Sequence, residues 1–197
     1  MYIHKIPNIV YVFYHAVVTE WSPQGTIPLG TIFNYSTLID SFEELEYFTN
    51  CNGSFSFRSS NLRKVRVPSN TIRFSYGYVF YGTKLEGTLR LPNGMTATSQ
   101  YAFSKLRSSA PITVIFPPEI TSAGDVVNGS ESQRYRFISV FLSTTPPTLS
   151  TQAHYNSVGT IYVPDTSIDA YKTASTWSHY TGGGGRFKPL SDYEGEL

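Results

Sequence analysis

The sequence predicts a β-rich solenoid, in which repeats of about 24 residues stack and each contributes one short parallel strand. Two observations lead to this prediction. An apolar run that ends in proline recurs along the chain and closes at Pro68, Pro92 and Pro117, which are 24 and 25 positions apart. Fifteen Tyr and thirteen Phe, with abundant Ser, Thr, Gly and Pro, favour strands and turns over helices. Such repeats bury their apolar sides only against their neighbours, so the ends of the stack need caps.

The first 40 residues do not share this pattern. They contain three prolines and two β-like runs, at residues 9–18 and 31–35. We therefore expect residues 1–40 to form an extended arm or strand pair that attaches or oligomerises the chain. Charged residues and prolines interrupt the apolar stretch at the N-terminus, so we do not expect a signal peptide. No run reaches the ~20 apolar residues that a helix needs to span a bilayer.

Residues 41–181 are expected to form the solenoid together with a C-terminal helical cap. Successive side chains of a strand point to opposite sides, so the alternation within each apolar run predicts an inward face. The proline that follows a run cannot donate to a strand ladder and ends the strand. The residues expected to point inward are Val65 and Val67, Leu89 and Leu91, Val114 and Phe116, Val140 and Leu142, and Ile161 and Val163.

The segment after the last strand predicts a short capping helix. Ile168, Tyr171, Ala174 and Trp177 fall on one helical face, at spacings of three residues. We expect this face to lie over the last repeat and to shield it from water. Four consecutive glycines at 182–185 follow, and residues 182–197 are expected to form a Gly-rich link and tail.

These C-terminal motifs resemble those of a known family. A Pro146-Pro147 turn, an apolar run that ends at Pro164 and a short helix that closes on Trp177 resemble the C-terminal cap of BspA-like leucine-rich-repeat proteins. The resemblance covers roughly residues 38–195 and implies that the repeats are irregular leucine-rich repeats.

The resemblance also implies roles for two further motifs. The Tyr-x-Phe motif at 78–80 and 101–103 matches an aromatic residue whose ring fills the corner opposite each strand, and residues 42–49 match an opening helix. Members of the family occur on surfaces of gut Bacteroidetes and in virions of the phages that infect them. These locations imply adhesion or assembly.

Charge is unevenly distributed along the chain, although the formal net charge is only +1. Residues 51–107 hold nine basic residues, all between 58 and 107, against the single acid Glu86. This basic block could face an anionic polymer or an acidic neighbouring subunit. It could equally be a solvated face of a repeat protein, because exposed charges contribute little to stability.

The outward face of the strands is the candidate binding surface. One residue of each strand is expected in a single outward column, which consists of Arg66, Arg90, Ile115, Phe141 and Tyr162. Repeat proteins bind partners with such surfaces, and exposed aromatic rings beside arginine suit protein contacts or sugar stacking. The alternative is that aromatic and β-branched residues occupy these positions only because they favour the strand conformation.

No pattern in the sequence indicates catalysis. Motifs of nucleophilic, phosphate-binding and metal-dependent enzymes are missing, and the four histidines are scattered, so we expect no catalytic residues, no metal and no cofactor. Cys51 is the single cysteine, so no intrachain disulfide can form, and we expect it to be a small buried side chain. We expect no nucleic-acid binding, because the aromatic residues are placed in the repeat core and not among the arginines, as a stacking platform would require.

These observations predict a non-enzymatic virion protein of a phage, with a structural, decoration or fibre role. It would display a binding surface for host glycans or neighbouring subunits, form a homo-oligomer, and have other virion or surface proteins as partners. The alternative is a bacterial cell-surface adhesin of a gut Bacteroidetes species. A third reading, a carbohydrate-active enzyme or its accessory module, would require paired carboxylates in a groove.

Overall fold

The computed structural model describes residues 29–48, 51–124, 137–149, 159–180 and 186–197. Most of these residues form short strands and turns. The strands are β1 (Ser41–Phe42), β2 (Lys64–Val65), β3 (Gly87–Arg90), β4 (Ile112–Phe116), β5 (Ser122–Ala123), β6 (Phe137–Phe141), β7 (Thr148–Leu149), β8 (Thr160–Val163) and β9 (Phe187–Pro189). The helical elements are η1 (Glu43–Tyr47), η5 (Asp165–Ser167), α2 (Ile168–Thr173), η6 (Ser178–Tyr180) and η7 (Leu190–Asp192).

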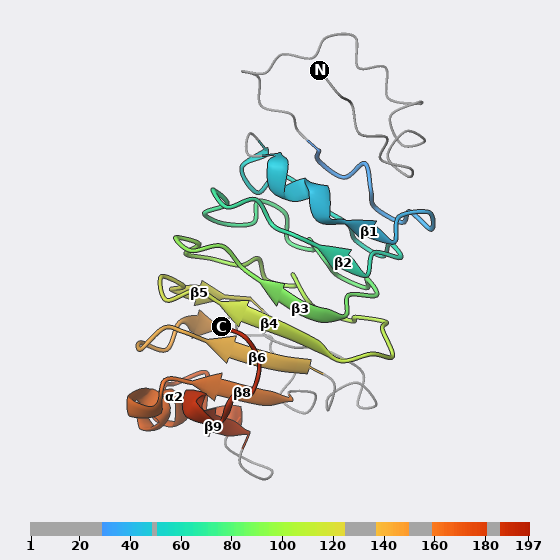
Figure 1. Cartoon of the computed structure of the whole chain (residues 1–197). Coiled ribbons are helices and arrows are strands. Elements are labelled where there is room, and N and C mark those ends of the chain that lie inside the picture. The colour runs from blue at the N-terminus through green and yellow to red at the C-terminus, as the bar shows by residue number, and fades with distance from the viewer. Residues whose placement is uncertain (1–28, 49–50, 125–136, 150–158, 181–185) are drawn as a thin grey trace.

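Parallel strands stack in the order of the chain (Figure 1). One sheet has five strands in the order β3-β4-β6-β8-β9, and β1 and β2 form a separate parallel pair. Gly87 pairs with Ile112, and Ile112 pairs with Phe137, so the chain returns to the neighbouring position after 25 residues each time. We call the stretch of chain from one strand to the next a winding.

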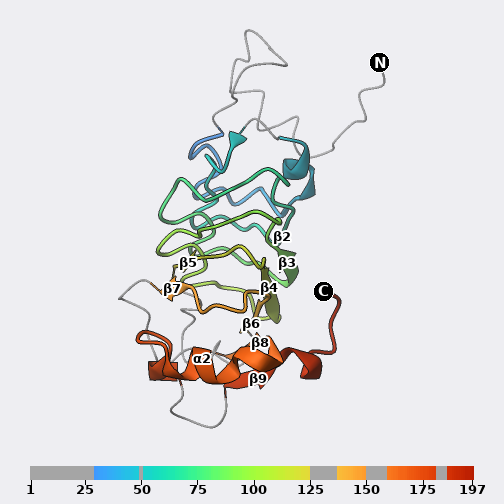
Figure 2. The ribbon, with the colours of Figure 1, turned by 90° about the vertical axis from the view of Figure 1, so that its left-hand side faces the viewer.

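Successive windings are also connected outside this sheet. The pair β5–β7 and the bridges Arg73–Ala97 and Ala97–Ser122 form a second parallel ladder. Figure 2 shows β5 and β7 on the side of the stack away from β3, β4 and β6. The stack is therefore held by backbone hydrogen bonds on more than one side.

A third connection lies at a corner that recurs in four windings. Tyr35, Ser59, Gly82 and Lys105 occupy it with φ values of 60°, 57°, 63° and 52°. The N–H groups of the first three donate to carbonyl groups of the next winding, at distances of 2.7, 2.6 and 2.9 Å. Glycine adopts this left-handed backbone readily, whereas other L-residues do so at a cost. Only one of the four is glycine, so the corner leaves little trace in the sequence.

A column of phenylalanine rings fills the core beside this corner. Phe33 stacks on Phe57 at 5.2 Å, Phe57 on Phe80 at 5.9 Å, and Phe80 on Phe103 at 5.7 Å, measured between ring centroids. All four rings are buried. Offset stacked rings contribute beyond the area that they bury, so this column ties the windings together from within.

Aromatic residues also close the C-terminal end of the stack. Tyr171 and Trp177 are buried, and Ile168 and Ala174 pack against the same core. The Trp177 indole N–H donates to the Pro147 carbonyl at 2.6 Å, and the Tyr171 hydroxyl donates to the Ser143 carbonyl at 3.0 Å. These bonds satisfy the polar atoms of both buried side chains, so the two rings can seal the stack without an unpaired donor.

Two expected boundaries fall inside the packed structure. Leu29, Phe33 and Ile39 belong to the core, and Gly30 pairs with Phe55, so residues 29–40 form part of a winding and do not stand apart as an arm. Residues 186–197 include β9, the last strand of the sheet, and are therefore more than a tail. The rest of the predicted arm, residues 1–28, lies outside the described residues, as does the glycine run. The assignment to a leucine-rich-repeat solenoid stays a prediction.

Candidate functional site

The strand register decides which residues share the outward column. Arg90 pairs with Ile115, Ile115 with Val140, and Val140 with Tyr162. Val114 and Phe116, on either side of Ile115, belong to the core, whereas Ile115 does not. Arg90, Ile115 and Tyr162 therefore lie on the outer face of the sheet, as the alternation predicts.

The expected position of Phe141 is wrong. Phe141 pairs with Phe116, stacks on its ring at 4.2 Å, and is completely buried in the core. Val140, which was expected to point inward, takes its place in the outward column, so that expectation is wrong. The expected inward position of Leu142 is wrong for the same reason, and Leu142 is only half-buried. The register was hidden because β6 buries a polar residue, Ser139, on its inner face, where the sequence pattern suggested an apolar one.

The outward column is open at one end and covered at the other. The side chains of Arg66 and Arg90 are exposed. In contrast, Ile115 is 1% exposed and Val140 is 0% exposed, although neither belongs to the core cluster. Tyr162 is half-buried against Tyr193, with 5.2 Å between the ring centroids.

The C-terminal segment covers part of this face. It passes in front of β8 and β6 in Figure 1, and Figure 2 shows the C-terminus on the side of the stack that carries β4 and β6. Of the predicted column, Arg66 and Arg90 are exposed on the outer face, whereas Tyr162 is half-buried.

A hollow of about 360 Å³ opens between β2 and β3, and Arg66 is among the residues that line it. The two strands start in contact, where the N–H groups of Lys84 and Glu86 donate to the carbonyls of Leu62 and Arg63 at 3.0 and 3.1 Å. No strand pairing between β2 and β3 follows in the described part of the chain. The outer face is therefore hollowed where the ladder is interrupted.

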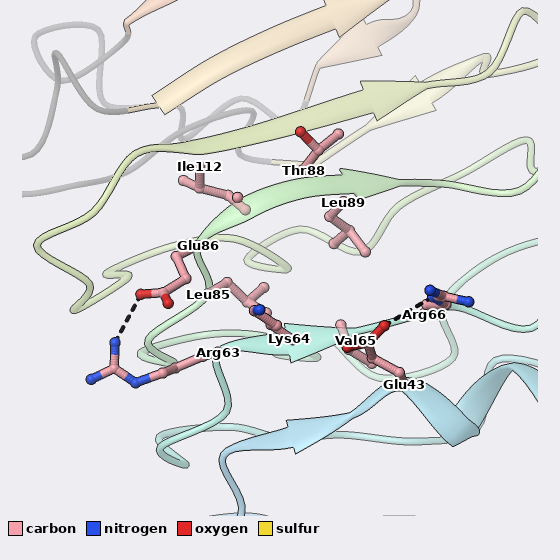
Figure 3. A pocket seen from close by; sticks show the side chains of 11 residues that line it. Glu43, Arg63, Lys64, Val65, Arg66, Leu85, Glu86, Thr88, Leu89 and Ile112 are labelled. Atoms are coloured by element: carbon pink, nitrogen blue, oxygen red, sulfur yellow. Dashed lines mark hydrogen bonds and ion pairs between the residues drawn. The ribbon is translucent and has the colours of Figure 1, made fainter. Parts of the chain in front are cut away.

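The hollow has an apolar floor and a charged rim. Four residues of the hydrophobic core form its floor, namely Val65, Leu85, Leu89 and Ile112. Ion pairs stand at its two ends in Figure 3, one between Arg63 and Glu86 and the other between Arg66 and Glu43. Arg63 Nη1 lies 2.8 Å from Glu86 Oε2, and Arg66 Nε lies 3.0 Å from Glu43 Oε2.

Further acidic groups hold both arginines in place. Asp40 lies 3.1 Å from Arg63, and Glu46 lies 3.3 Å from Arg66. Two carboxylates on each guanidinium leave little of the arginine charge for a ligand. The arginines therefore shape the rim more than they attract an anion.

Lys64 lies between these two pairs and differs from them (Figure 3). Its side chain is exposed and forms no ion pair with any residue in the described ranges. An ammonium group is a compact point charge on a flexible stem, which suits contact with a single carboxylate. The hydroxyl of Thr88, exposed on β3, offers a further hydrogen-bonding group.

The sequence alone did not reveal Lys64 as a member of the site. The basic block contains nine similar charges, and the sequence does not distinguish the arginines that are paired from Lys64, which has no ion-pair partner among the described residues. Their partners Asp40, Glu43 and Glu46 come from the preceding winding, so only the stacking brings them near.

Among the described residues, no group of three or more His, Cys, Asp and Glu side chains is placed to hold a metal ion. None of the helices in the described ranges has the length and apolarity that crossing a membrane requires. Comparison of the chain with protein-family models, with curated proteins and with solved structures found no match. The resemblance to BspA-like proteins therefore stays a prediction.

Proposed function

We propose that this protein is a non-enzymatic component of a phage virion, and that its charged hollow docks an acidic segment of a neighbouring protein subunit. The observation that carries the proposal is Lys64, which lies above an apolar floor at a break in the sheet and forms no ion pair with the residues that the structure describes. A carboxylate next to an apolar side chain would match both parts of the hollow. The family resemblance and the stack of short parallel strands support an architecture that presents surfaces to partners.

The volume of the hollow is within the range of specific binding sites, yet its rim holds groups of both signs. Such a mixture restricts where a partner's carboxylate can bind. A carboxylate placed on Arg63 or Arg66 would be repelled by Glu86 or Glu43. A partner carboxylate that binds Lys64 has no competing carboxylate on the same cation among the described residues. The charge pattern therefore favours one docking position over its neighbours.

The test begins with quantitative proteomics of gradient-purified phage particles. A fixed number of copies per particle is expected for a structural virion protein. The absence of the chain from particles would contradict the virion role and would favour the alternative, a bacterial cell-surface adhesin.

The second step compares two charge reversals of the same kind. Lys64→Glu should lower the number of copies per particle several-fold, because it puts a third acid into the rim. Lys172→Glu reverses an exposed charge on the capping helix α2 and should leave the copy number unchanged. Equal incorporation of the two variants would contradict docking at the hollow.

A further inference from the structure

A second surface of the stack carries tyrosine rings interleaved with cations. It consists of Tyr35, Arg58, Tyr78, Tyr81, Tyr101 and Lys105, which we call the tyrosine platform. The Arg58 guanidinium carbon lies 4.6 Å from the ring centroid of Tyr78, 5.5 Å from that of Tyr81 and 5.9 Å from that of Tyr35. The Lys105 ammonium lies 5.7 Å from the Tyr81 centroid. The expectation that the aromatic residues lie in the core and not among the arginines is therefore wrong for this surface.

The recurring corner builds this platform. Phe57, Phe80 and Phe103 are buried in the core just before the corner, and the platform residues flank them in the chain. Arg58 and Tyr81 directly follow two of these phenylalanines, and Tyr78 and Tyr101 precede two of them by two positions. Tyr78 and Tyr101 stack on each other across adjacent windings, with 5.0 Å between centroids and 13° between ring planes. The platform thus extends along the stack.

Part of the platform faces water. Tyr35 is 62% exposed and Tyr78 is 37% exposed, and Lys105 is also exposed. Large exposed aromatic rings on a protein surface are typical of binding sites when they gather in one place. Here they gather around two cations, and no acidic residue is found in ion-pair contact with Arg58 or Lys105 within the described ranges.

Arg58 is the cation around which three of these rings gather. Its Nε atom is buried and has no hydrogen-bond partner among the described residues. A guanidinium has five N–H donors in a planar fork and is suited to bind a carboxylate through two of them. The three surrounding rings make cation–π contacts with the guanidinium, and these contacts do not replace hydrogen bonds to its N–H groups.

We propose that the tyrosine platform binds an acidic saccharide, with sugar rings against the exposed tyrosines and a carboxylate on Arg58 and Lys105. Sugars present C–H groups from one face of the ring, and these pack against aromatic rings, while the tyrosine hydroxyls and the Gln100 side chain can bond to sugar hydroxyls. Gln100 Nε2 already lies 3.1 Å from the Tyr101 hydroxyl at this surface.

An acidic saccharide fits this surface better than a nucleic acid. Single-stranded nucleic acids also stack on aromatic rings, but most of their affinity comes from cations that neutralise successive phosphates. The platform has two cations for four tyrosine rings. One carboxylate for every one or two sugar rings matches that ratio.

The inference does not depend on the charged hollow, which lies on the sheet face between β2 and β3. Binding can be measured by isothermal titration calorimetry with the full chain. The probes are oligogalacturonate, an uncharged oligosaccharide of equal length, and an oligothymidylate. We expect oligogalacturonate to bind and the uncharged oligosaccharide to bind at least tenfold more weakly.

Variants then locate the binding site. Tyr35→Asn and Lys105→Asn should each weaken oligogalacturonate binding at least tenfold. Both residues have positive φ, which asparagine tolerates, so the fold should persist and can be checked by circular dichroism. Lys172→Asn removes one exposed charge elsewhere and should not change the affinity, and Lys64→Glu should not change it either.

Three outcomes would overturn the proposal. They are no binding of oligogalacturonate, binding that Tyr35→Asn and Lys105→Asn leave unchanged, and tighter binding of the oligothymidylate than of the saccharide. A failure of Lys64→Glu to alter virion incorporation would count only against the docking hollow, so the two proposals fail separately.

Discussion

The outer sheet face of this protein is divided into an open half and a covered half. On β2 and β3 it carries exposed charged side chains around a hollow, whereas on β4, β6 and β8 it carries Ile115, Val140 and Tyr162, which are buried or half-buried. The ladder is interrupted between β2 and β3 in the open half, whereas β4, β6 and β8 pair continuously in the covered half. The difference arises from this interruption, from the outward residues and from the C-terminal segment that crosses the covered half, and it restricts partners of this face to the N-terminal half.

The strongest way to disturb the covered half is to remove the ring that closes its end. Trp177→Ala should lower the free energy of unfolding by about 3–5 kcal/mol, because it empties a buried site and leaves the Pro147 carbonyl without its donor. Chemical denaturation followed by circular dichroism measures the change. Trp177→Phe keeps most of the ring packing and should cost clearly less, and an unaltered midpoint for Trp177→Ala would refute the capping role.

The corresponding disturbance of the open half is at Gly53. This residue has a φ of +74°, and a Cβ atom there would overlap the carbonyl oxygen of Arg73 in the next winding. Gly53→Ala should therefore destabilise the protein by about 3 kcal/mol, from backbone strain and overpacking together.

Gly94 provides a matched control for Gly53. Its φ is +82°, but a Cβ atom there would meet nothing within 4 Å. Gly94→Ala should cost only the backbone strain, about 1 kcal/mol. Equal losses of stability for the two variants would show that the close approach of the windings at Gly53 does not matter.

A direct comparison of the two halves uses paired residues of neighbouring strands. Ile115→Ala should destabilise by about 2 kcal/mol because Ile115 is buried on the covered half. Arg90→Ala, its partner across the β3–β4 ladder, should change the free energy of unfolding by less than about 0.5 kcal/mol because Arg90 is exposed. If both variants were neutral in urea denaturation, the cover over Ile115 would be in question.

The smallest expected effect is a pH dependence of the free energy of unfolding that differs between the two halves. Burial raises the pKa of the Cys51 thiol in the open half and that of the Tyr171 hydroxyl in the covered half. The folded chain thus retains these protons at a pH where the unfolded chain loses them. Each protonated group therefore contributes stability at low pH, and this contribution is lost as the pH rises above the group's pKa in the unfolded chain. That value is about 8.5 for cysteine and about 10 for tyrosine.

Between these two pKa values Cys51, and not Tyr171, should lower the stability as the pH rises. The urea midpoint of the wild-type chain should fall between pH 7 and pH 9.5, and it should fall less in Cys51→Ala. An equal fall in the two proteins would contradict the assignment of this effect to the thiol.

The sequence allowed the strands to be located but not all of their faces. Pro68, Pro92 and Pro117 mark strand ends, and alternation placed Ile115 and Tyr162 outward. The same rule failed in β6, where the buried Ser139 interrupts the apolar pattern and shifted Phe141 to the wrong face. A pattern of hydrophobicity cannot reveal a register that the neighbouring strands impose.

The candidate sites were harder to predict than the strands. The hollow exists because β2 and β3 do not pair, and nothing local to residues 62–67 or 85–91 indicates this. The Tyr-x-Phe motif predicts only the ring that fills the core and not the outer tyrosine, so it does not indicate the tyrosine platform. The phenylalanine fills the corner, and the tyrosine two positions earlier stands outside it.

The ties at the recurring corner limit how a molecule of this kind can change its length. Each tie connects residues 22 or 23 positions apart, such as Ser59 and Tyr81 or Gly82 and Ser104. An insertion between Phe80 and Phe103 that matches one winding preserves every ladder and adds one unit to the phenylalanine column. An insertion of half that length would put outward residues into the core. Homologous molecules should therefore differ in height by whole windings, each of which lengthens the molecule by one strand spacing, about 4.8 Å.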